Sequence, residues 1–554
     1  MKYILPFLFI SFITFGQNRE STSNSILLPL NVKGAQKPVS INEKIDSIMS
    51  FFNHPAFPAV QLGVIKNGKL IYSKSYGNED IEKNIPASSK SNFNLASNSK
   101  QFTAMCIMLL QEEGRLKRTD NIRKYLPEMP DYGKTITIND LLNHTSGLRD
   151  YLDLYQLTCK PIFELSKKEI LKLITDQKHL NFYPGEYHLY SNTNYLLLGL
   201  IVERVSGISL HKFIRDNIFL PLNMRHTYFS DEKSITNEVK NYAKNGTAFF
   251  LTKNKYSAIY GDGGILSNMD DLVLWDQNFY HNILGKKSNE LIDEIQKTGL
   301  LNNKENTFYG GGLFNIQYKG RQAIFHGGGY NSFSTQLLRF PTDSLSIIFL
   351  SAVNVKFDFY CFQIADLFFQ STLKSNPIIQ PPPLKSENFS GYYFDETLAG
   401  FLLLDQNNNS ISVRGVKYMQ ENVNEYTAKD IWDWEKHLKF STSIKGDTLM
   451  NYQAADINDN YRKLAEDTLS TKFKGGYICH ELPNINFELN FNENKPVFMV
   501  NGRYSADVTK TFGTIGLIPT FGAIVEFQVN SENKVTGFNL STDRVKNLFF
   551  QKNK

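Results

Sequence analysis

The stretch that decides the fold is FNLASNSKQFTAMCIMLLQEEG, residues 93–114. After Lys100 its residues are mostly apolar, which predicts a buried helix. Just before that apolar run, Ser97 stands three residues ahead of Lys100. Residues i and i+3 share one face of a helix, so the two side chains are expected to lie within hydrogen-bonding reach.

A serine and a lysine at this spacing permit nucleophilic chemistry. A serine hydroxyl becomes reactive when a neighbouring base takes its proton, and a lysine in a dry site has a lowered pKa that lets the neutral amine act as that base. The alternative is a helix cap followed by a solvated lysine. S-x-x-K occurs five times, at Ser97, Ser209, Ser230, Ser371 and Ser531. Only the first match is followed by a long apolar segment that would carry its lysine into the core.

Two further stretches carry groups suited to the same chemistry. In YPGEYHLYSNTNY, residues 183–195, Tyr190 can relay a proton and Asn192 can hold a substrate carbonyl. In QAIFHGGGYNSF, residues 322–333, His326 precedes three glycines that would let a substrate lie against a strand edge. Taken alone, Y-x-N recurs elsewhere in the chain, and His326 fits an ordinary loop histidine.

Together these stretches resemble the serine β-lactamase and penicillin-binding-protein superfamily, in particular its class C β-lactamases, D-Ala-D-Ala carboxypeptidases, D-aminopeptidases and related esterases. The resemblance covers about residues 42–374 and includes ITINDLLNHTSGL, with His144 and Gly147, and GDGGILSNMDDLVLW. It implies an α+β fold with a β-lactamase/transpeptidase-like antiparallel sheet covered by helices. The order of predicted elements, strands then helices then strands, independently indicates an α+β body.

The resemblance also implies a role for each candidate residue. Ser97 would be the acylated nucleophile, Lys100 would activate it, and Tyr190 would share the proton transfers. Asn192 would orient the substrate amide, and the backbone N–H groups of Ser97 and Gly329 would form an oxyanion hole. The implied substrate-binding set is Asn192, His326, Gly328 and Gly329, with no metal and no cofactor.

The third motif departs from the family pattern. Many relatives carry Lys-Thr-Gly where this chain has His326, Gly327 and Gly328. Lysine is a fixed positive charge for a substrate carboxylate, whereas histidine is only partly charged near neutral pH. Gly327 also lacks the threonine hydroxyl. These departures argue against efficient β-lactam hydrolysis and favour a peptidase that acts on D-residues, or an esterase.

The sequence therefore predicts a serine hydrolase that forms an acyl-enzyme on an amide or ester, with a small molecule or short peptide as substrate. The alternative is a non-hydrolytic sensor or binding protein that keeps the fold. The sequence contains no G-x-S-x-G elbow and no H-E-x-x-H zinc helix. Four scattered cysteines have no zinc-binding spacing. A net charge of +5 without a Lys/Arg-rich block gives no reason to expect a nucleic-acid partner.

The chain is long enough to require more than one core. Residues 1–16, MKYILPFLFISFITFG, are typical of a secretory signal peptide, and their apolar run is short for a membrane span. Export to the periplasm or the extracellular space is therefore expected, without stable membrane insertion. Residues 17–40 would form a flexible leader, residues 41–375 the hydrolase domain, and the Pro-rich residues 376–386 a linker.

Residues 387–554 are rich in alternating strand patterns and contain a repeat. NFSGYYFDETL and KFKGGYICHEL carry Phe, Gly, Tyr and Leu at the same spacing. Two similar halves of about 80 residues predict one closed or nearly closed barrel, because closure removes exposed strand edges. These halves resemble the lipocalin-like barrels appended to some hydrolases of the same superfamily.

Overall fold

The computed structural model describes residues 39–553, apart from residues 55, 161–165, 233–234, 253–259, 370–386, 396–398, 408–409, 414–415, 430–434, 445–446 and 455–456. The expected signal peptide, the linker and nearly all of the expected leader lie outside the described residues. Within the described ranges, no helix is long and apolar enough to cross a membrane.

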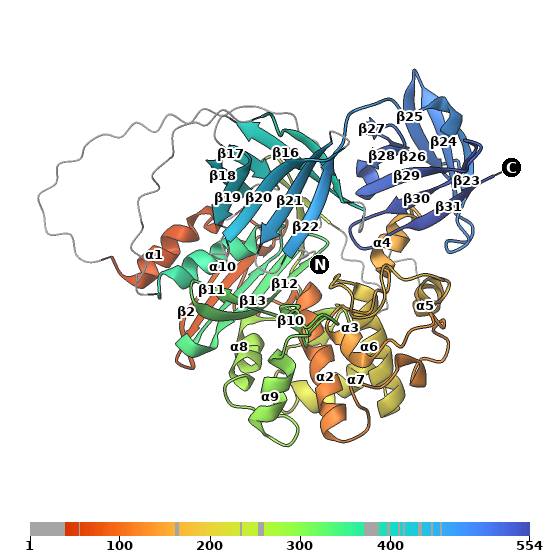
Figure 1. Ribbon diagram of the computed structural model, residues 1–554. Helices are drawn as coiled ribbons and strands as arrows, with labels where there is room; N and C mark the ends of the chain where they lie inside the picture. Colours follow the sequence, from red (N-terminus) through yellow and green to blue (C-terminus); the bar gives the residue numbers. More distant parts are fainter. Residues whose placement is uncertain are drawn as a thin grey trace, which may run out of the picture.

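A seven-stranded antiparallel sheet forms the centre of the first unit, with the strand order β10-β11-β12-β13-β14-β1-β2 (Figure 1). Its strands are β1 (Val60–Lys66), β2 (Lys69–Tyr76), β10 (Tyr309–Gly310), β11 (Leu313–Tyr318), β12 (Arg321–Tyr330), β13 (Phe333–Phe340) and β14 (Leu345–Ser351). The first hairpin turns at Asn67 and Gly68, whose φ angles of 51° and 73° fit a type I′ turn. Because β1 pairs with β14, the first and last strands of the unit lie side by side in this sheet.

Helices cover both faces of this sheet. On one face lie α1 (Ile41–Ile48) and α10 (Phe357–Asp366). The other face carries α2 (Lys100–Glu112), α3 (Ile138–Leu142), α4 (Tyr151–Gln156), α5 (Lys167–Thr175), α6 (Asn192–Ser206), α7 (Leu210–Ile214), α8 (Met269–Asn278) and α9 (Asn289–Gln296). Alternate residues of β14 belong to the two cores, Phe349 to the first and Leu350 to the second. The predicted α+β class, a sheet covered by helices, is confirmed.

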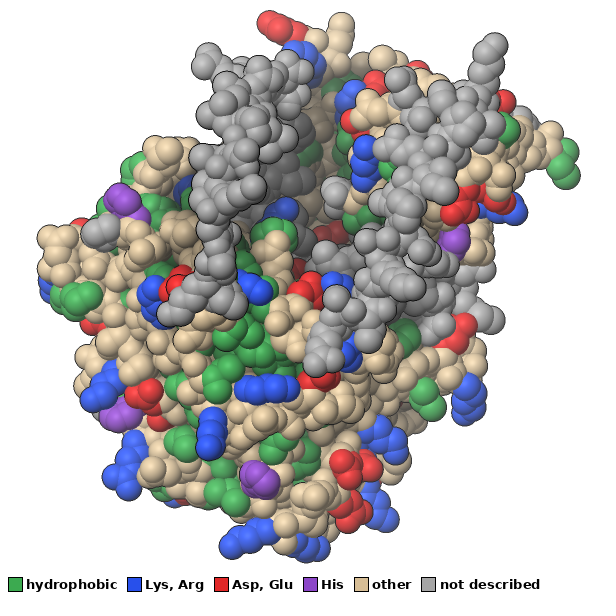
Figure 2. Space-filling model, turned by 90° about the vertical axis from the view of Figure 1, so that its left-hand side faces the viewer, with side chains coloured by type: hydrophobic (Ala, Val, Ile, Leu, Met, Phe, Trp, Pro, Cys, Tyr) green, Lys and Arg blue, Asp and Glu red, His purple; other side chains and the backbone are tan. Residues whose placement is uncertain are grey.

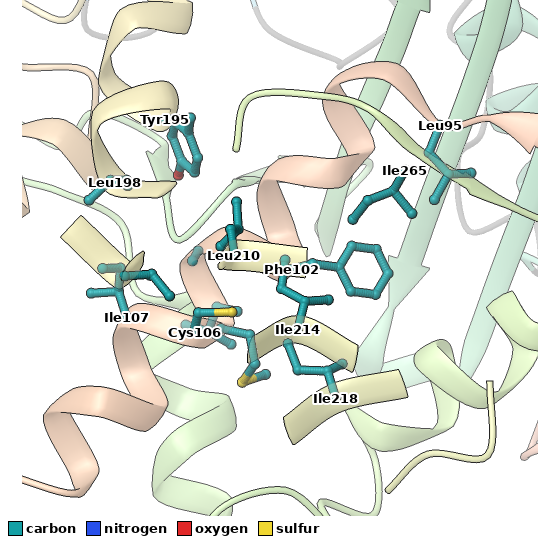
Figure 3. Packing of buried hydrophobic residues seen from close by; sticks show 14 of the residues in the cluster. Leu95, Phe102, Cys106, Ile107, Tyr195, Leu198, Leu210, Ile214, Ile218 and Ile265 are labelled. Atoms are coloured by element: carbon teal, nitrogen blue, oxygen red, sulfur yellow. The ribbon is translucent and has the colours of Figure 1, made fainter. Parts of the chain in front are cut away.

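The buried α2 helix organises the larger core. Phe102, Cys106 and Ile107 of α2 pack with Leu198 of α6 and Ile214 of α7 (Figure 3). The remaining short strands of this unit are β3 (Asn78–Asp80), β4 (Ile85–Pro86), β5 (Phe93–Asn94), β6 (Tyr228–Phe229), β7 (Tyr242–Asn245), β8 (Ala248–Leu251) and β9 (Ile265–Ser267). Cys106 is thus a core residue, and all four cysteines of the chain are unpaired.

The C-terminal part forms two β units. The first is a closed barrel of β15 (Gly391–Asp395), β16 (Gly400–Asn407), β17 (Ser410–Val413), β18 (Val416–Asn422), β19 (Glu425–Lys429), β20 (Glu435–Thr442), β21 (Thr448–Ala454) and β22 (Ile457–Lys463). The second is a nine-stranded sheet of β23 (Gly475–Ile478), β24 (Asn486–Asn492), β25 (Lys495–Val500), β26 (Tyr504–Asp507), β27 (Lys510–Phe512), β28 (Ile515–Ile518), β29 (Ala523–Val529), β30 (Val535–Ser541) and β31 (Leu548–Lys552).

The closed barrel predicted from the sequence is present, but the expectation that both halves share it is wrong. In each half the first strand pairs with the last, β15 with β22 and β23 with β31. The first and last strands of each half therefore form hydrogen bonds with each other and, among the described residues, not with strands of the other half. Strands of one half are closer in sequence than strands of different halves. Pairing within a half therefore needs a shorter loop to close, which costs less entropy.

The sequence repeat encodes the start of each β unit. Gly391 and Gly475 open β15 and β23 with φ angles of 135° and 139°, a region that favours glycine. Two residues later, a buried tyrosine donates its hydroxyl to the carbonyl four residues earlier. Tyr393 donates to Phe389 over 3.0 Å, and Tyr477 donates to the equivalent phenylalanine, Phe473.

The nine-stranded unit docks on the helical layer beside α4 (Figure 1). Arg149 and Glu481 form an almost completely buried ion pair there, with Nη1 and Oε2 2.9 Å apart. The barrel packs against the nine-stranded unit through rings such as Tyr392 and Phe512, whose centroids are 5.3 Å apart. On the face shown in Figure 2, basic and acidic side chains are interspersed.

Candidate active site

The predicted pair of Ser97 and Lys100 lies at the start of α2. Ser97 belongs to a 3-10 turn, Ala96–Ser99, and the α-helix begins at Lys100. The Nζ of Lys100 lies 3.1 Å from the Oγ of Ser97. By contrast, Ser209 in another S-x-x-K match caps α7, where its side chain accepts a hydrogen bond from the backbone of Lys212. The predicted contact therefore forms at the match that precedes the apolar helix.

Lys100 is buried among oxygen atoms. Besides Ser97, its Nζ contacts Oδ1 of Asn192 at 2.9 Å and the backbone oxygen of Asp262 at 2.7 Å. Burial lowers the pKa of Lys100 to about 7, and the charge of Arg544 acts in the same direction. The charges of Asp262 and Asp150 act in the opposite direction and raise this pKa. A substantial fraction of Lys100 is therefore neutral at pH 7 and able to take the proton of Ser97.

Tyr190 is buried beside this pair, with its ring centroid 5.0 Å from Nζ of Lys100. Its hydroxyl faces Ser97 but makes no hydrogen bond of good geometry with a described residue. Burial raises the pKa of Tyr190 well above its ordinary value, although Ser97 and Arg544 oppose this shift. The phenol therefore stays protonated at neutral pH, which suits it to donate a proton and leaves the role of base to Lys100.

Asp150 holds Asn192 in place. Asn192 is the first residue of α6, and its backbone N and Nδ2 donate to Oδ2 of Asp150 over 2.5 and 2.9 Å. The other oxygen of Asp150 caps α4 by accepting from the backbone of Leu152 and Asp153. This arrangement turns Oδ1 of Asn192 towards Lys100. Asp150 was not predicted, although it is the second residue after the HTSGL motif.

The glycines of the third motif bring β12 against the turn that carries Ser97. A Cβ atom on Gly328 would lie 2.3 Å from the carbonyl oxygen of Leu95 and 2.4 Å from Oγ1 of Thr335. On Gly329 the same atom would meet nothing within 4 Å. Gly328 thus permits the close approach of the two backbones, as expected of glycine at a strand edge. The oxyanion hole from Ser97 and Gly329 stays a prediction.

His326 differs from its predicted state. Its side chain is fully buried, with Nδ1 2.6 Å from the carbonyl of Gly327 and Nε2 3.1 Å from the hydroxyl of Tyr309. Since the carbonyl can only accept, Nδ1 carries the proton and Nε2 accepts from Tyr309. Burial lowers the pKa of His326 to about 3, and nearby Lys100 acts in the same direction. The expectation of partial charge near neutral pH is wrong, because desolvation keeps the imidazole neutral.

Two further residues of the site were missed. Asp262 contacts Lys100 through its backbone, and its Oδ2 accepts from the hydroxyl of Tyr151 over 2.9 Å. The GDGGI stretch around it was noted, so an aspartate between glycines was an available signal. Arg544 lies between β30 and β31 of the nine-stranded unit, with its guanidinium carbon 5.1 Å from the ring centroid of Tyr190. Its surroundings, STDRVKN, carry no signal that distinguishes it from a surface loop.

One protein family covers the part of the chain that holds Ser97 and Lys100. A sequence model of the Beta-lactamase family matches residues 45–364, more than half of the chain. The chain belongs to the Beta-lactamase family. The family region contains Ser97, Lys100, Tyr190 and His326, whereas Arg544 lies outside it.

Two relatives show how far the likeness extends. Penicillin-binding protein 4* of Bacillus subtilis is 32% identical over 305 residues, which are 52% of this chain and 66% of that protein. Protein flp of Staphylococcus aureus is 28% identical over 324 residues, 57% of this chain and 64% of that protein. The alignments thus span just under two thirds of the length of these Beta-lactamase-family relatives.

Solved structures show the same fold. The octameric penicillin-binding protein homologue from Pyrococcus abyssi has a TM-score of 0.55 at 19% identity and covers 76% of this chain and 99% of its own. The penicillin-binding protein from Bacillus halodurans has a TM-score of 0.51 at 22% identity and covers 59% of this chain and 99% of its own. These likenesses concern the fold of the Beta-lactamase family and not its chemistry.

Proposed function

We propose that this protein is an exported serine hydrolase that works through an acyl-enzyme on an amide or ester. The contact between Nζ of Lys100 and Oγ of Ser97, 3.1 Å long and buried, carries this proposal. A lysine with a pKa of about 7 next to a serine forms an activated nucleophile. A binding protein that keeps the fold would have no need for this pair.

The proposed reaction follows from the positions of the side chains. Neutral Lys100 takes the hydroxyl proton of Ser97 while Oγ attacks the carbonyl carbon of the substrate. The N–H groups of Ser97 and Gly329 stabilise the oxyanion, and each such donor contributes about 3 kcal/mol in serine hydrolases. Tyr190 passes its proton to the leaving group and regains one from Lys100. Water then attacks the acyl-enzyme and gives a proton to Lys100, which passes it to Oγ of Ser97 as the bond between Oγ and the acyl carbon breaks and the acid product leaves.

The proposed substrate is a peptide that contains a D-amino acid, or a small ester. The buried neutral His326 gives no fixed charge at the third motif, which argues against efficient turnover of β-lactams. One relative is named a penicillin-binding protein. For this chain we expect that penicillin acylates Ser97 and that the acyl-enzyme then hydrolyses slowly.

The test compares the protein with Ser97→Ala on a peptide ending in D-Ala-D-Ala, on its L counterpart and on p-nitrophenyl acetate. We expect hydrolysis of the D-peptide or the ester, no hydrolysis of the L-peptide, and loss of activity in Ser97→Ala. Unchanged activity in Ser97→Ala would contradict the proposal. A variant that keeps full biological function without this serine would instead support the non-hydrolytic alternative.

A further inference from the structure

A loop of the nine-stranded unit reaches the hydrolase site. Arg544, in the loop between β30 and β31, stacks over the ring of Tyr190, with 15% of its side chain exposed. The nearest acid, Asp150, lies 3.9 Å away, beyond hydrogen-bond distance, and its Oδ2 already accepts two N–H groups of Asn192. No described residue accepts a hydrogen bond from the guanidinium of Arg544.

The backbone around Arg544 is fixed on the hydrolase unit. Its N–H donates to Oδ2 of Asp153 over 3.1 Å, and its carbonyl accepts from Nδ2 of Asn181 over 3.0 Å. Thr542 donates to the same carboxylate of Asp153 over 2.6 Å. The guanidinium is therefore placed beside the site by bonds that do not involve its own nitrogen atoms.

The other cationic groups around Tyr190 are not available to an anion. Lys100 already contacts three oxygens and acts as the base in its neutral form. His326 is buried and neutral. Although burial opposes its charge, Asp150 and Asp153 raise the pKa of Arg544. Arg544 therefore keeps a fixed positive charge with N–H donors to spare.

We propose that Arg544 binds a carboxylate of the substrate, so that the C-terminal β unit supplies a specificity-determining residue to the hydrolase site. This inference rests on the proposed function and narrows its substrate to an amide or ester that bears a carboxylate. A guanidinium offers parallel N–H donors that match the two oxygens of a carboxylate. Partial burial beside Tyr190 strengthens such a pair relative to one in water.

The test uses two pairs of esters that differ by one carboxylate. The p-nitrophenyl monoester of glutarate is compared with p-nitrophenyl valerate, and m-carboxyphenyl acetate with phenyl acetate, so that the charge lies on either side of the ester bond. The variants are Arg544→Met, Arg544→Lys and, as a matched control, Arg503→Met, an exposed arginine on the same unit.

We expect the protein to prefer the carboxylate member of at least one pair in kcat/KM. Arg544→Met should reduce that preference about tenfold or more. The neutral ester is the reference, because the charge of Arg544 also acts on Lys100 and Tyr190, and this effect is common to both esters. Arg544→Lys should keep part of the preference, and Arg503→Met all of it. An absent preference, an unchanged preference in Arg544→Met, or an equal loss on both esters would overturn the inference, since an equal loss indicates an effect on the site that does not depend on a substrate carboxylate.

Labelling of Ser97 by a neutral fluorophosphonate separates this inference from the proposed function. If Ser97 is labelled but Arg544→Met leaves the preference intact, only the inference fails. If Ser97 is not labelled, the proposed function fails, and binding of free glutarate, with the carboxylate-free methyl valerate as control, is then followed by thermal unfolding. Stabilisation by glutarate alone that disappears in Arg544→Met would support the carboxylate site, and its absence in the unaltered protein would overturn it.

Discussion

Burial moves the pKa values of Lys100 and Tyr190 in opposite directions, which suits the two groups to the proton transfers proposed for them. Burial penalises the charged form of each group. It therefore lowers the pKa of Lys100 to about 7 and raises that of Tyr190. At neutral pH the amine can accept a proton and the phenol can give one, which is the pairing that acyl transfer from Ser97 requires.

The rate at which Ser97 is acylated should rise with pH through about 7, the pKa of Lys100. Below this pH Lys100 carries a proton and cannot act as base, so the rate should fall about tenfold per pH unit. Above it the rate should level off. The rate of fluorophosphonate labelling between pH 5 and 9 measures this, and a pH-independent rate would contradict the role of Lys100.

Lys100→Ala should slow hydrolysis of p-nitrophenyl acetate at least about a hundredfold, because the reaction loses its general base. The matched control is Lys212→Ala, in the S-x-x-K match where Ser209 is a helix cap. This control should hydrolyse the ester at the normal rate. Similar rates in the two variants would show that Lys100 has no special role.

The predictability of these residues follows from their distance in sequence. Ser97 and Lys100 lie one turn apart, so helical geometry alone brings them together. Tyr190 was predicted from the Y-x-N motif that it forms with Asn192. Asp150 and Arg544 could not be predicted, because their roles arise from tertiary contacts with Asn192 and Tyr190 that no local pattern encodes. The neutral state of His326 likewise depends on burial.

At the scale of elements, the close approach of β12 to the turn before α2 sets the geometry of the site. Gly328 lies against the backbone of Leu95, whereas its neighbour Gly329 has open space beside it. Two adjacent glycines in one strand therefore have different steric requirements. This difference allows a matched test of the contact.

Gly328→Ala should destabilise the protein by about 1–3 kcal/mol, because the added Cβ would force the two backbones apart. Gly329→Ala has room for the methyl group, so it should change stability by less than about 0.5 kcal/mol. Denaturant unfolding of the two variants measures the difference. Equal destabilisation would contradict the close packing of β12 on this turn.

The elements themselves were predictable to different degrees. The hairpin at Asn67 and Gly68 was predictable, because its turn is determined by neighbouring residues in the sequence. The C-terminal repeat correctly indicated two β halves, whose first strands begin in the structure at Gly391 and Gly475. It could not show that the first strand of each half pairs with the last strand of the same half, β15 with β22 and β23 with β31, or that only the first half forms a closed barrel.

At the scale of the whole molecule, the nine-stranded unit is fastened beside the active site. Glu481 accepts hydrogen bonds from Arg149 and from the backbone of Lys178 and His179. The same interface carries the loop of Arg544. Substrate selection in this account therefore depends on a contact between two parts of the chain that are far apart in sequence.

Glu481→Ala should weaken this docking by about 3–5 kcal/mol, because it leaves the buried charge of Arg149 without its partner. The control Glu488→Ala, an exposed residue of β24 on the same unit, should have little effect. Hydrogen exchange of residues 542–547 reports the docking directly. Unchanged protection in Glu481→Ala would contradict the importance of this ion pair.

The activated serine is tested most directly by the intact mass of the protein after fluorophosphonate treatment, followed by peptide mapping. We predict a single adduct, located on Ser97 and absent from Ser97→Ala. A folded protein that gains no adduct, or one that carries it on another serine, would contradict the assignment of Ser97 as the nucleophile.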